Sequence, residues 1–183
     1  MTNSRRTEKD SVLVLRTLCF PSPLGWILIA ASSEGICLLD FCGSAQPSDA
    51  EILRRVRKEY PGAAAEPSED FPLLGQVKEA LLEYLDHGTE LPPFPLDTSK
   101  GTPFQREVWN ALSRIPFGET RSYVEIAGSI GRPRAARAVG QACGKNPLAI
   151  LIPCHRVVAT GGKLGGYTGG LDFKEALLKL EQK

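Results

Sequence analysis

Histidine, cysteine and long apolar segments are scarce in this 183-residue chain, and each shortage excludes a class of function. The only two histidines, His87 and His155, nearly exclude a metal site built from several imidazoles. The five cysteines are odd in number and form no CxxC pair, so we expect reduced thiols and no disulfide framework. No apolar run reaches the roughly 18 residues of a membrane span, and the polar N-terminus does not resemble a signal peptide. The chain is expected to be cytoplasmic.

Charge is balanced overall but unevenly distributed along the chain. The net charge of +1 combines −5 over residues 1–100 with +6 over residues 101–183. An excess of Lys and Arg in one half favours an acidic partner such as nucleic acid. A solvated basic face of no functional consequence explains the same numbers, so charge alone leaves both interpretations open.

Turn signals and hydrophobic periodicity divide the chain into two parts. Apolar runs separated by "PSPLG" and "SSEG" predict three strands at 12–20, 26–32 and 35–41. Helical spacing follows at 49–60 and 73–87. A Pro- and Gly-rich segment then has no periodicity. We therefore expect an α+β protein with a small N-terminal α/β domain at 1–92, a linker at 93–101 and a mostly helical domain at 102–183.

Three helix starts are readable in the second part. Thr102 before Pro103 is a plausible N-cap, and the Ser-x-x-Glu of "SYVE" is a capping box. A third helix is predicted to begin at Pro133 and to end at Gly144. Two short helices joined by a glycine turn, the second rich in arginine and alanine, are typical of a helix-turn-helix. A basic surface helix of an enzyme is the alternative.

The segment "NPLAILIPCHRVV" (146–158) carries a thiol, an imidazole and a guanidinium at the end of what reads as a buried strand. It is either a core strand with a polar exit or a strand that presents Cys154 for chemistry. A thiol is only slightly ionised at neutral pH and needs a base. His155 is adjacent, but neighbouring side chains of a strand point to opposite faces, so contact requires a turn or a bridging water. A later acid, such as Glu181, could orient the imidazole.

The glycine-rich segment "ATGGKLGGYTGGL" follows directly. Such a loop beside a reactive group suggests close approach of backbone to a planar ligand. It contains no phosphate-binding motif. A cysteine hydrolase remains an alternative at this point, although it would need access for water and should turn over.

The run "IPCHRVV", preceded by "RAVGQACGKNP" and followed by "GGYTGGL", resembles the methylated-DNA–protein-cysteine methyltransferases, the O6-alkylguanine repair family. The resemblance extends to "SPLGWILIAASSEGIC" in the first half. It implies a ribonuclease-H-like N-terminal domain and a winged-helix-like DNA-binding domain. The implied activity is stoichiometric, irreversible transfer of the alkyl group from O6-alkylguanine, and from O4-alkylthymine, to Cys154. The base is flipped out of duplex DNA from the minor groove, by a monomer, with no cofactor.

The resemblance also implies roles for individual residues. Arg137 would replace the flipped base in the stack, and Tyr123 would crowd the 3′ phosphate and drive rotation. Glu181 would orient His155, which a water links to the thiol. The implied catalytic residues are Cys154, His155, Glu181, Tyr123 and Asn146. The implied DNA-binding residues are Arg137, Tyr123, Arg132, Arg134, Ala136 and Thr160. The implied pocket residues are Val157, Tyr167, Thr168 and Pro153, with carbonyls of Cys154 and Val157 accepting from the guanine amine.

The sequence departs from the family pattern at Thr168, where some relatives have serine, and in its histidine content. Some members bind zinc in the N-terminal half through two cysteines and two histidines, whereas this half holds only His87, so no metal is carried over. Two binding proteins are the rival interpretations. Lesion sensors related to the family lack the acceptor cysteine, and a helix-turn-helix transcription factor would not need the Pro-Cys-His-Arg segment. Inside a cell we expect association with the nucleoid of a bacterium or the nucleus of a eukaryote.

Overall fold

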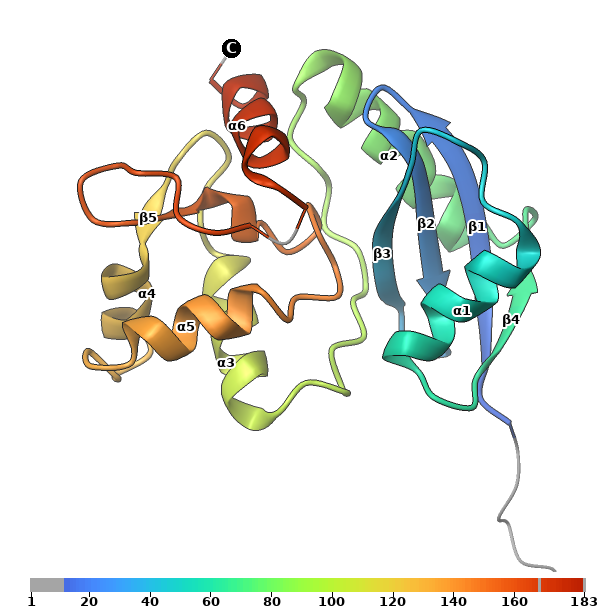
Figure 1. Ribbon diagram of the computed structural model, residues 1–183, viewed down its shortest axis with the longest axis horizontal. Helices are drawn as coiled ribbons and strands as arrows, with labels where there is room; N and C mark the ends of the chain where they lie inside the picture. The colour runs from blue at the N-terminus through green and yellow to red at the C-terminus, as the bar shows by residue number, and fades with distance from the viewer. Residues whose placement is uncertain (1–11, 168, 183) are drawn as a thin grey trace, which may run out of the picture.

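The computed structural model describes residues 12–167 and 169–182, which form a sheet flanked by helices and, beside it, a cluster of short helices (Figure 1). The first part contains the strands and helices β1 (Val14–Ser22), β2 (Gly25–Ala31), β3 (Ile36–Gly43), α1 (Asp49–Glu59), β4 (Ala64–Pro67) and α2 (Pro72–His87). The strand order is β3-β2-β1-β4, with β1 to β3 antiparallel and β4 parallel to β1. The three predicted strands and both helices are confirmed, whereas β4 was not predicted.

The central strand β2 is covered on both faces. Ile27 and Ile29 pack with residues of α2 on one face, and Leu28 and Ala30 pack with Val56 of α1 on the other. Figure 1 shows α1 in front of the sheet and α2 behind it. Because side chains alternate along a strand, a strand buried on both faces reads as the continuous apolar run found here.

The second part consists of α3 (Pro103–Leu112), β5 (Arg121–Ser122), α4 (Tyr123–Ser129), α5 (Ala136–Cys143), the 3-10 helix η1 (Cys154–Arg156), β6 (Val157–Val158) and α6 (Leu171–Leu180). Both predicted caps are confirmed, because Thr102 and Ser122 each accept from the backbone of the third helical residue. Helix α5 begins at Ala136, so the prediction of a start at Pro133 was wrong. The amide of Ala135 donates to the carbonyl of Arg132 at 2.8 Å and closes a turn before the helix.

The segment that leads to Cys154 is a buried turn and not the predicted strand. Leu148 forms a single bridge with Leu39, and Ile150 has a φ of 67°. The amide of Ile152 donates back to the carbonyl of Leu148 at 2.8 Å. The apolar run correctly predicts that this segment is buried. Periodicity cannot, however, distinguish a buried strand from a buried turn.

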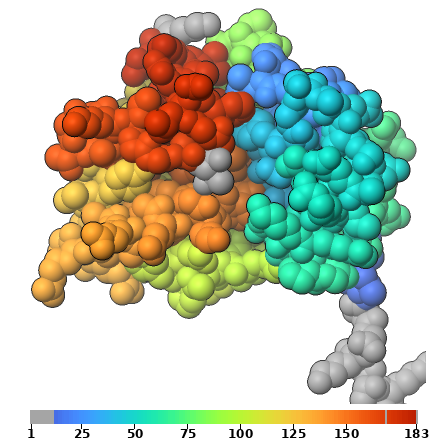
Figure 2. Space-filling model, viewed as in Figure 1, coloured from blue at the N-terminus to red at the C-terminus, as the bar shows by residue number. Residues whose placement is uncertain are grey.

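The two parts are joined along the outer edge of β3. The amide of Ile36 donates to the carbonyl of Pro95 at 2.9 Å, and the amide of Asp97 donates to the carbonyl of Ile36 at 2.8 Å. The amide of Leu39 donates to the carbonyl of Pro147 at 2.8 Å. In Figure 2 the blue-to-cyan surface of the first part abuts the orange-to-red surface of the second. This edge therefore does not remain free for pairing with another chain, a common liability of edge strands.

One large core extends through both parts and contains residues of β2, α2, α3, α5 and α6. None of the helices within 12–167 and 169–182 is long and apolar enough to cross a membrane.

The edge pairing predicts that Gly35 cannot be enlarged. Its φ is 144°, and a Cβ at this position would lie 2.4 Å from the carbonyl oxygen of Pro95. We expect Gly35→Ala to lower the free energy of unfolding by about 3 kcal/mol, because backbone strain adds to displacement of the linker. Urea unfolding measures the change.

Gly75→Ala is the matched control, since Gly75 lies in α2 and a Cβ added there would have open space for 4 Å around it. This variant should raise stability by up to about 1 kcal/mol. Equal stability of Gly35→Ala and the original chain would contradict the tight contact between Gly35 and the linker.

Candidate functional site

A groove of about 700 Å³ lies between α4, α5 and the glycine-rich loop, and Cys154 is at its wall. Helix α5 contributes small side chains and Arg137 to this groove. The structure thus brings Cys154 together with five other residues predicted from the sequence, namely Tyr123, Ala136, Arg137, Thr160 and Tyr167. The remaining lining residues are Val124, Gly140, Gln141, Cys143, Gly144, Ala159 and Gly166.

Cys154 is the first residue of η1, and the residue is only 8% exposed. The amide of Cys154 donates to the carbonyl of Ile152 at 2.7 Å, which tightens the turn that ends the apolar run. Burial raises the pKa of this thiol, while the hydrogen bond from Asn146 and the charge of Lys174 act in the opposite direction. A reactive thiolate here requires a proton acceptor nearby.

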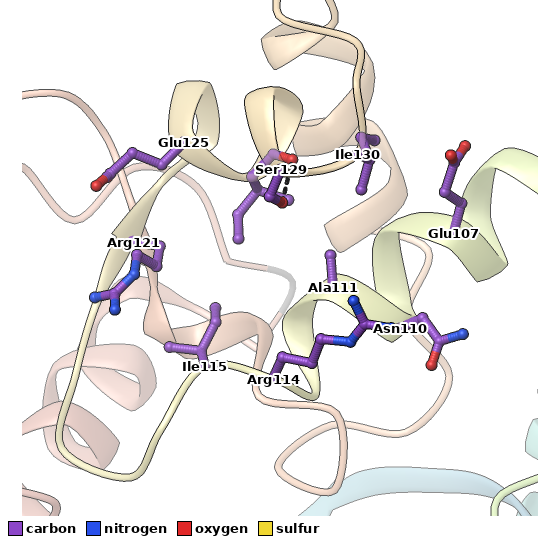
Figure 3. A pocket seen from close by; sticks show the side chains of 10 residues that line it. Glu107, Asn110, Ala111, Arg114, Ile115, Arg121, Glu125, Ser129 and Ile130 are labelled. Carbon is purple, nitrogen blue, oxygen red and sulfur yellow. Dashed lines mark hydrogen bonds between the residues drawn. The ribbon is translucent and has the colours of Figure 1, made fainter.

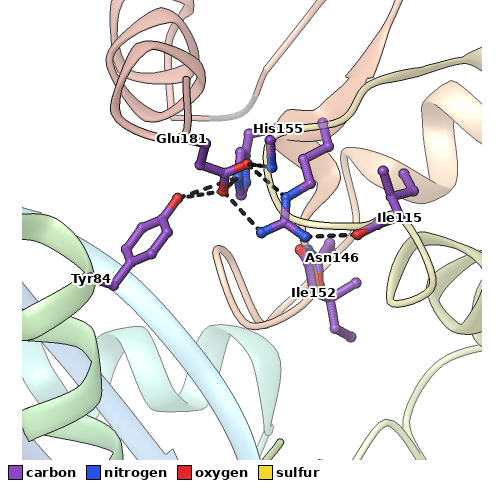
Figure 4. Close-up of polar contacts among 8 residues, drawn as sticks. Tyr84, Ile115, Asn146, Ile152, His155 and Glu181 are labelled. Carbon is purple, nitrogen blue, oxygen red and sulfur yellow. Dashed lines mark hydrogen bonds and ion pairs between the residues drawn. The ribbon is translucent and has the colours of Figure 1, made fainter. Parts of the chain in front are cut away.

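Asn146 fixes both the turn and the sulfur atom. Its Oδ1 accepts from the amide of Leu148 at 3.0 Å, and its Nδ2 donates to the carbonyl of Ile152 at 2.8 Å. The same Nδ2 lies 3.2 Å from Sγ of Cys154 as a donor. Figure 4 shows Asn146 beside Ile152. A single amide therefore couples the loop after α5 to the position of the thiol.

His155 and Glu181 form a buried pair beside Cys154. Nε2 of His155 lies 2.8 Å from Oε1 of Glu181, and the two side chains are 0% and 1% exposed. Burial lowers the pKa of His155, and the Glu181 carboxylate acts against that shift. The imidazole is therefore neutral near pH 7, and an N–H at Nε2 leaves Nδ1 as the acceptor.

Nδ1 of His155 is buried and has no hydrogen-bond partner among the described residues. A buried polar atom without a partner is rare and is commonly satisfied by water or ligand. The water that the family resemblance places between His155 and the thiol stays a prediction, and the unpartnered Nδ1 is the atom that it would contact.

The carboxylate of Glu181 accepts hydrogen bonds from several parts of the chain. It accepts from His155, from Tyr84 at 2.7 Å, from Nε and Nη2 of Arg156 at 2.9 and 3.0 Å, and from the amide of Gly118 at 3.3 Å (Figure 4). Burial raises the pKa of Glu181, but the donors outweigh burial and hold it at about 2. Tyr84, Arg156 and Gly118 were not assigned to the site from the sequence. The arginine of the Pro-Cys-His-Arg segment was the one available signal.

Lys174 is a further residue that sequence reasoning missed. It is 0% exposed, and its Nζ donates to the backbone carbonyls of Val157 and Leu164. Burial lowers the pKa of Lys174. The sequence did contain a signal for it. Lys174 lies three residues before the buried Leu177 in an amphipathic helix, which places it on the face that points to the core. Its charge lies close enough to Cys154 to favour the thiolate.

Several predicted residues lie outside the groove. Arg132 forms an ion pair with Glu107 at 3.1 Å, and Arg134 is exposed. Pro153 and Val157 are both buried, within three residues of Cys154, and do not line the groove. The carbonyls of Cys154 and Val157 already accept from within the chain, although each keeps a second lone pair. Thr168 lies outside the described residues.

A separate hollow of about 470 Å³ between α3 and α4 contains none of the predicted site residues (Figure 3). Charged side chains including Arg114, Arg121 and Glu125 line it. It holds no thiol or imidazole among its lining residues, so it offers no counterpart to the chemistry beside Cys154. In the described ranges no three His, Cys, Asp or Glu side chains are grouped as metal ligands would be.

Family models match both parts of the chain. Residues 15–98 match the model described as "6-O-methylguanine DNA methyltransferase, ribonuclease-like domain". Residues 103–183 match "6-O-methylguanine DNA methyltransferase, DNA binding domain". The chain belongs to the 6-O-methylguanine DNA methyltransferase family. The resemblance found in the sequence and the expected α+β fold are thereby confirmed.

Individual relatives within this family cover almost the whole chain. A methylated-DNA–protein-cysteine methyltransferase of Methanosarcina acetivorans is 44% identical over 88% of this chain and 95% of its own length. The inducible enzyme of Bacillus subtilis is 40% identical over 85% and 83%. Among solved structures, Mycobacterium tuberculosis OGT in complex with DNA is similar, with a TM-score of 0.73, 39% identity and 93% of both chains covered.

The depressed pKa of Glu181 predicts an acid-dependent loss of stability. Its stabilising contribution is complete above the ordinary glutamate value of 4.5 and is lost as the pH falls toward about 2. The difference corresponds to at most about 3 kcal/mol of folding free energy. We expect Glu181→Gln to be destabilised by up to this amount at pH 7 and to lose less stability than the original chain between pH 4.5 and pH 2.

Chemical unfolding at a series of pH values measures this dependence. Glu175→Gln is the control, because Glu175 pairs with Lys179 at 2.8 Å on the exposed face of the same helix. Its effect should stay below about 0.5 kcal/mol. An acid dependence that Glu181→Gln leaves intact would assign the stability change to other carboxylates.

Proposed function

We propose that Cys154 is the residue that accepts the methyl group in the repair of O6-methylguanine, the activity of this family. The observation that carries the proposal is the thiol's position. Cys154 lies at the wall of the groove formed with α5 and adjoins the buried His155–Glu181 pair. The groove offers space for a base, and the pair offers a proton acceptor.

The groove is suited to a planar base. Tyr123 and Tyr167 supply aromatic surface, and glycines and alanines supply much of the remaining wall. The hydroxyl of Tyr167 is buried and lacks a hydrogen-bond partner among the described residues, so it is available to a bound base. A base inside a duplex must first leave the stack to reach such a site.

The chemical step is a displacement at the methyl carbon. The bond from Sγ to carbon forms as the bond from carbon to O6 breaks, and the electron pair of the broken bond passes to the guanine. The thiol proton passes through water to Nδ1 of His155, and His155 returns to its neutral form by releasing one proton as the departing guanine anion takes one up. The products are S-methylcysteine and unmodified guanine, so atoms and charges balance without a cofactor.

The reaction is expected to occur once per molecule. A thioether is a poor leaving group, and no group in the described site is placed to remove the methyl from sulfur. Alkyl transfer is therefore stoichiometric and irreversible. The same displacement would apply to O4-alkylthymine if that base enters the groove.

The positions of Arg137 and Tyr123 support approach from the minor groove of duplex DNA. Arg137 is exposed at the first turn of α5 and lines the groove that leads to the thiol. The small residues of α5 permit a close approach to the narrow minor groove of DNA.

The protein groove, the thiol and the relay formed by His155 and Glu181 all come from one chain, so a monomer is sufficient. We further infer a division into 1–92, a linker at 93–101 and 102–183, since the linker contains no helix and no extended strand.

Intact-protein mass spectrometry tests Cys154 as the acceptor. After incubation with a duplex that carries O6-methylguanine, each molecule should gain one methyl group and then react no further, with the methyl mapping to Cys154. Cys154→Ser should gain none while it still binds the duplex. Cys42→Ser, changed at a partly exposed thiol of the sheet, should react like the original chain.

A methyl group on any other cysteine would overturn the assignment of Cys154. Tight binding of the damaged duplex without any gain in mass would instead indicate a lesion sensor.

Arg137→Ala should slow methyl transfer at least about tenfold, because unstacking a base costs a few kcal/mol that the inserted guanidinium offsets. The melting temperature should not change, since the side chain is exposed. Arg54→Ala on the exposed face of α1 is the control for loss of one positive charge. Equal slowing by both variants would point to general electrostatic attraction and against a specific role in flipping.

A further inference from the structure

One side chain of helix α2 in the N-terminal domain, Tyr84, contacts the His155–Glu181 pair of the other domain. The hydroxyl of Tyr84 donates to Oε1 of Glu181 at 2.7 Å and lies 3.5 Å from Nε2 of His155. Tyr84 is 0% exposed and is separated from Glu181 by 97 residues of sequence. Figure 4 shows Tyr84 on the ribbon of α2, pointing toward Glu181.

The position of this hydroxyl is tightly constrained. The ring of Tyr84 packs edge-on against Phe117, with centroids 6.4 Å apart. Burial raises the pKa of Tyr84, and the neighbouring Glu181 carboxylate acts in the same direction. The hydroxyl therefore stays protonated throughout the working range and can serve only as a donor to the carboxylate.

We propose that Tyr84 is a positioning residue for methyl transfer, which sets the orientation and basicity of Glu181 and, through Glu181, of His155. The proposal rests on the proposed function of Cys154 as acceptor. It gives the N-terminal domain a part in the chemistry as well as in the fold.

Oε1 of Glu181 is shared among three donors, which are Tyr84, Nε2 of His155 and Nη2 of Arg156. Each donor withdraws electron density and limits how strongly the carboxylate attracts the proton on His155. Without the tyrosine hydroxyl, the carboxylate becomes more basic and holds the imidazolium form more firmly.

A higher pKa of His155 leaves a smaller fraction of the imidazole neutral at acid pH. His155 must be neutral at Nδ1 to take the thiol proton, so a rise in its pKa moves the acid limb of the rate profile to higher pH. Loss of the Tyr84 hydroxyl would also loosen the alignment of His155. The thiolate of Cys154 would then be stabilised less, which shifts the acid limb in the same direction. The other titratable groups that face this pair are Arg156, Lys174, Cys154 and Tyr167.

Tyr84→Phe isolates the hydroxyl, because the phenyl ring keeps the contact with Phe117. Single-turnover transfer from a duplex with O6-methylguanine should slow about tenfold, the scale of one hydrogen bond to a charged group. The acid limb of the rate–pH profile should move to higher pH. Affinity for the same duplex should stay unchanged, since Tyr84 does not line the groove.

Tyr60→Phe is the matched control. Tyr60 is also a buried tyrosine of the N-terminal domain, 5% exposed, and its hydroxyl donates to the carbonyl of Cys37 at 3.1 Å, in a part of the core that does not include the relay. This variant should lose a similar amount of stability and keep the original rate and acid limb. Equal slowing of both variants would overturn the proposal in favour of general destabilisation.

Replacement of Tyr84 by 3-fluorotyrosine tests the same hydrogen bond with the fold intact. A more acidic hydroxyl is a stronger donor, so the acid limb should move to lower pH, opposite to Tyr84→Phe. An acid limb that neither replacement moves would overturn the proposal. Failure of the original chain to methylate Cys154 would instead overturn the proposed function, so the two failures are distinguishable.

Discussion

The buried carboxylate of Glu181 is the interaction on which the arrangement of this protein depends. An uncompensated charge in the interior is costly, so each donor around it must be in place. These donors come from α2, from the loop after α3 and from η1. Because they lie far apart in sequence, satisfying one carboxylate fixes the N-terminal domain, the thiol segment and the last helix relative to one another.

The thiol site combines burial with the means to offset it. Burial disfavours the thiolate of Cys154, and the nearby amide of Asn146 and charge of Lys174 favour it. In the proposed function, the neutral His155 accepts the proton of the thiol. If Cys154 reacts once, as proposed, the site does not need to release its product and can enclose the reacting atom, whereas a hydrolase must admit water.

Both domains contribute to the structure around Cys154, one by forming the groove and the other by supporting it. Helices α4 and α5 and the glycine-rich loop form the groove, whereas the sheet contributes no residue to its lining as far as the chain is described. The edge of β3 nevertheless holds the linker and the turn before Cys154 through backbone hydrogen bonds. Rigid support of this kind limits movement of the thiol, which the proposed group transfer requires.

Local sequence determined β1, β2 and β3 of the sheet, the capped starts of α3 and α4, and the chemical identity of the Cys154 segment, because alternation, caps and motif residues act over a few positions. Tertiary structure alone decided that residues 146–153 form a turn instead of a strand, since an apolar run reports burial without specifying backbone direction. It also brought Tyr84 to Glu181 and the charge of Lys174 close to Cys154. Their partners are Glu181 and backbone carbonyls of distant segments, and no local pattern encodes a contact between residues brought together only when the chain packs.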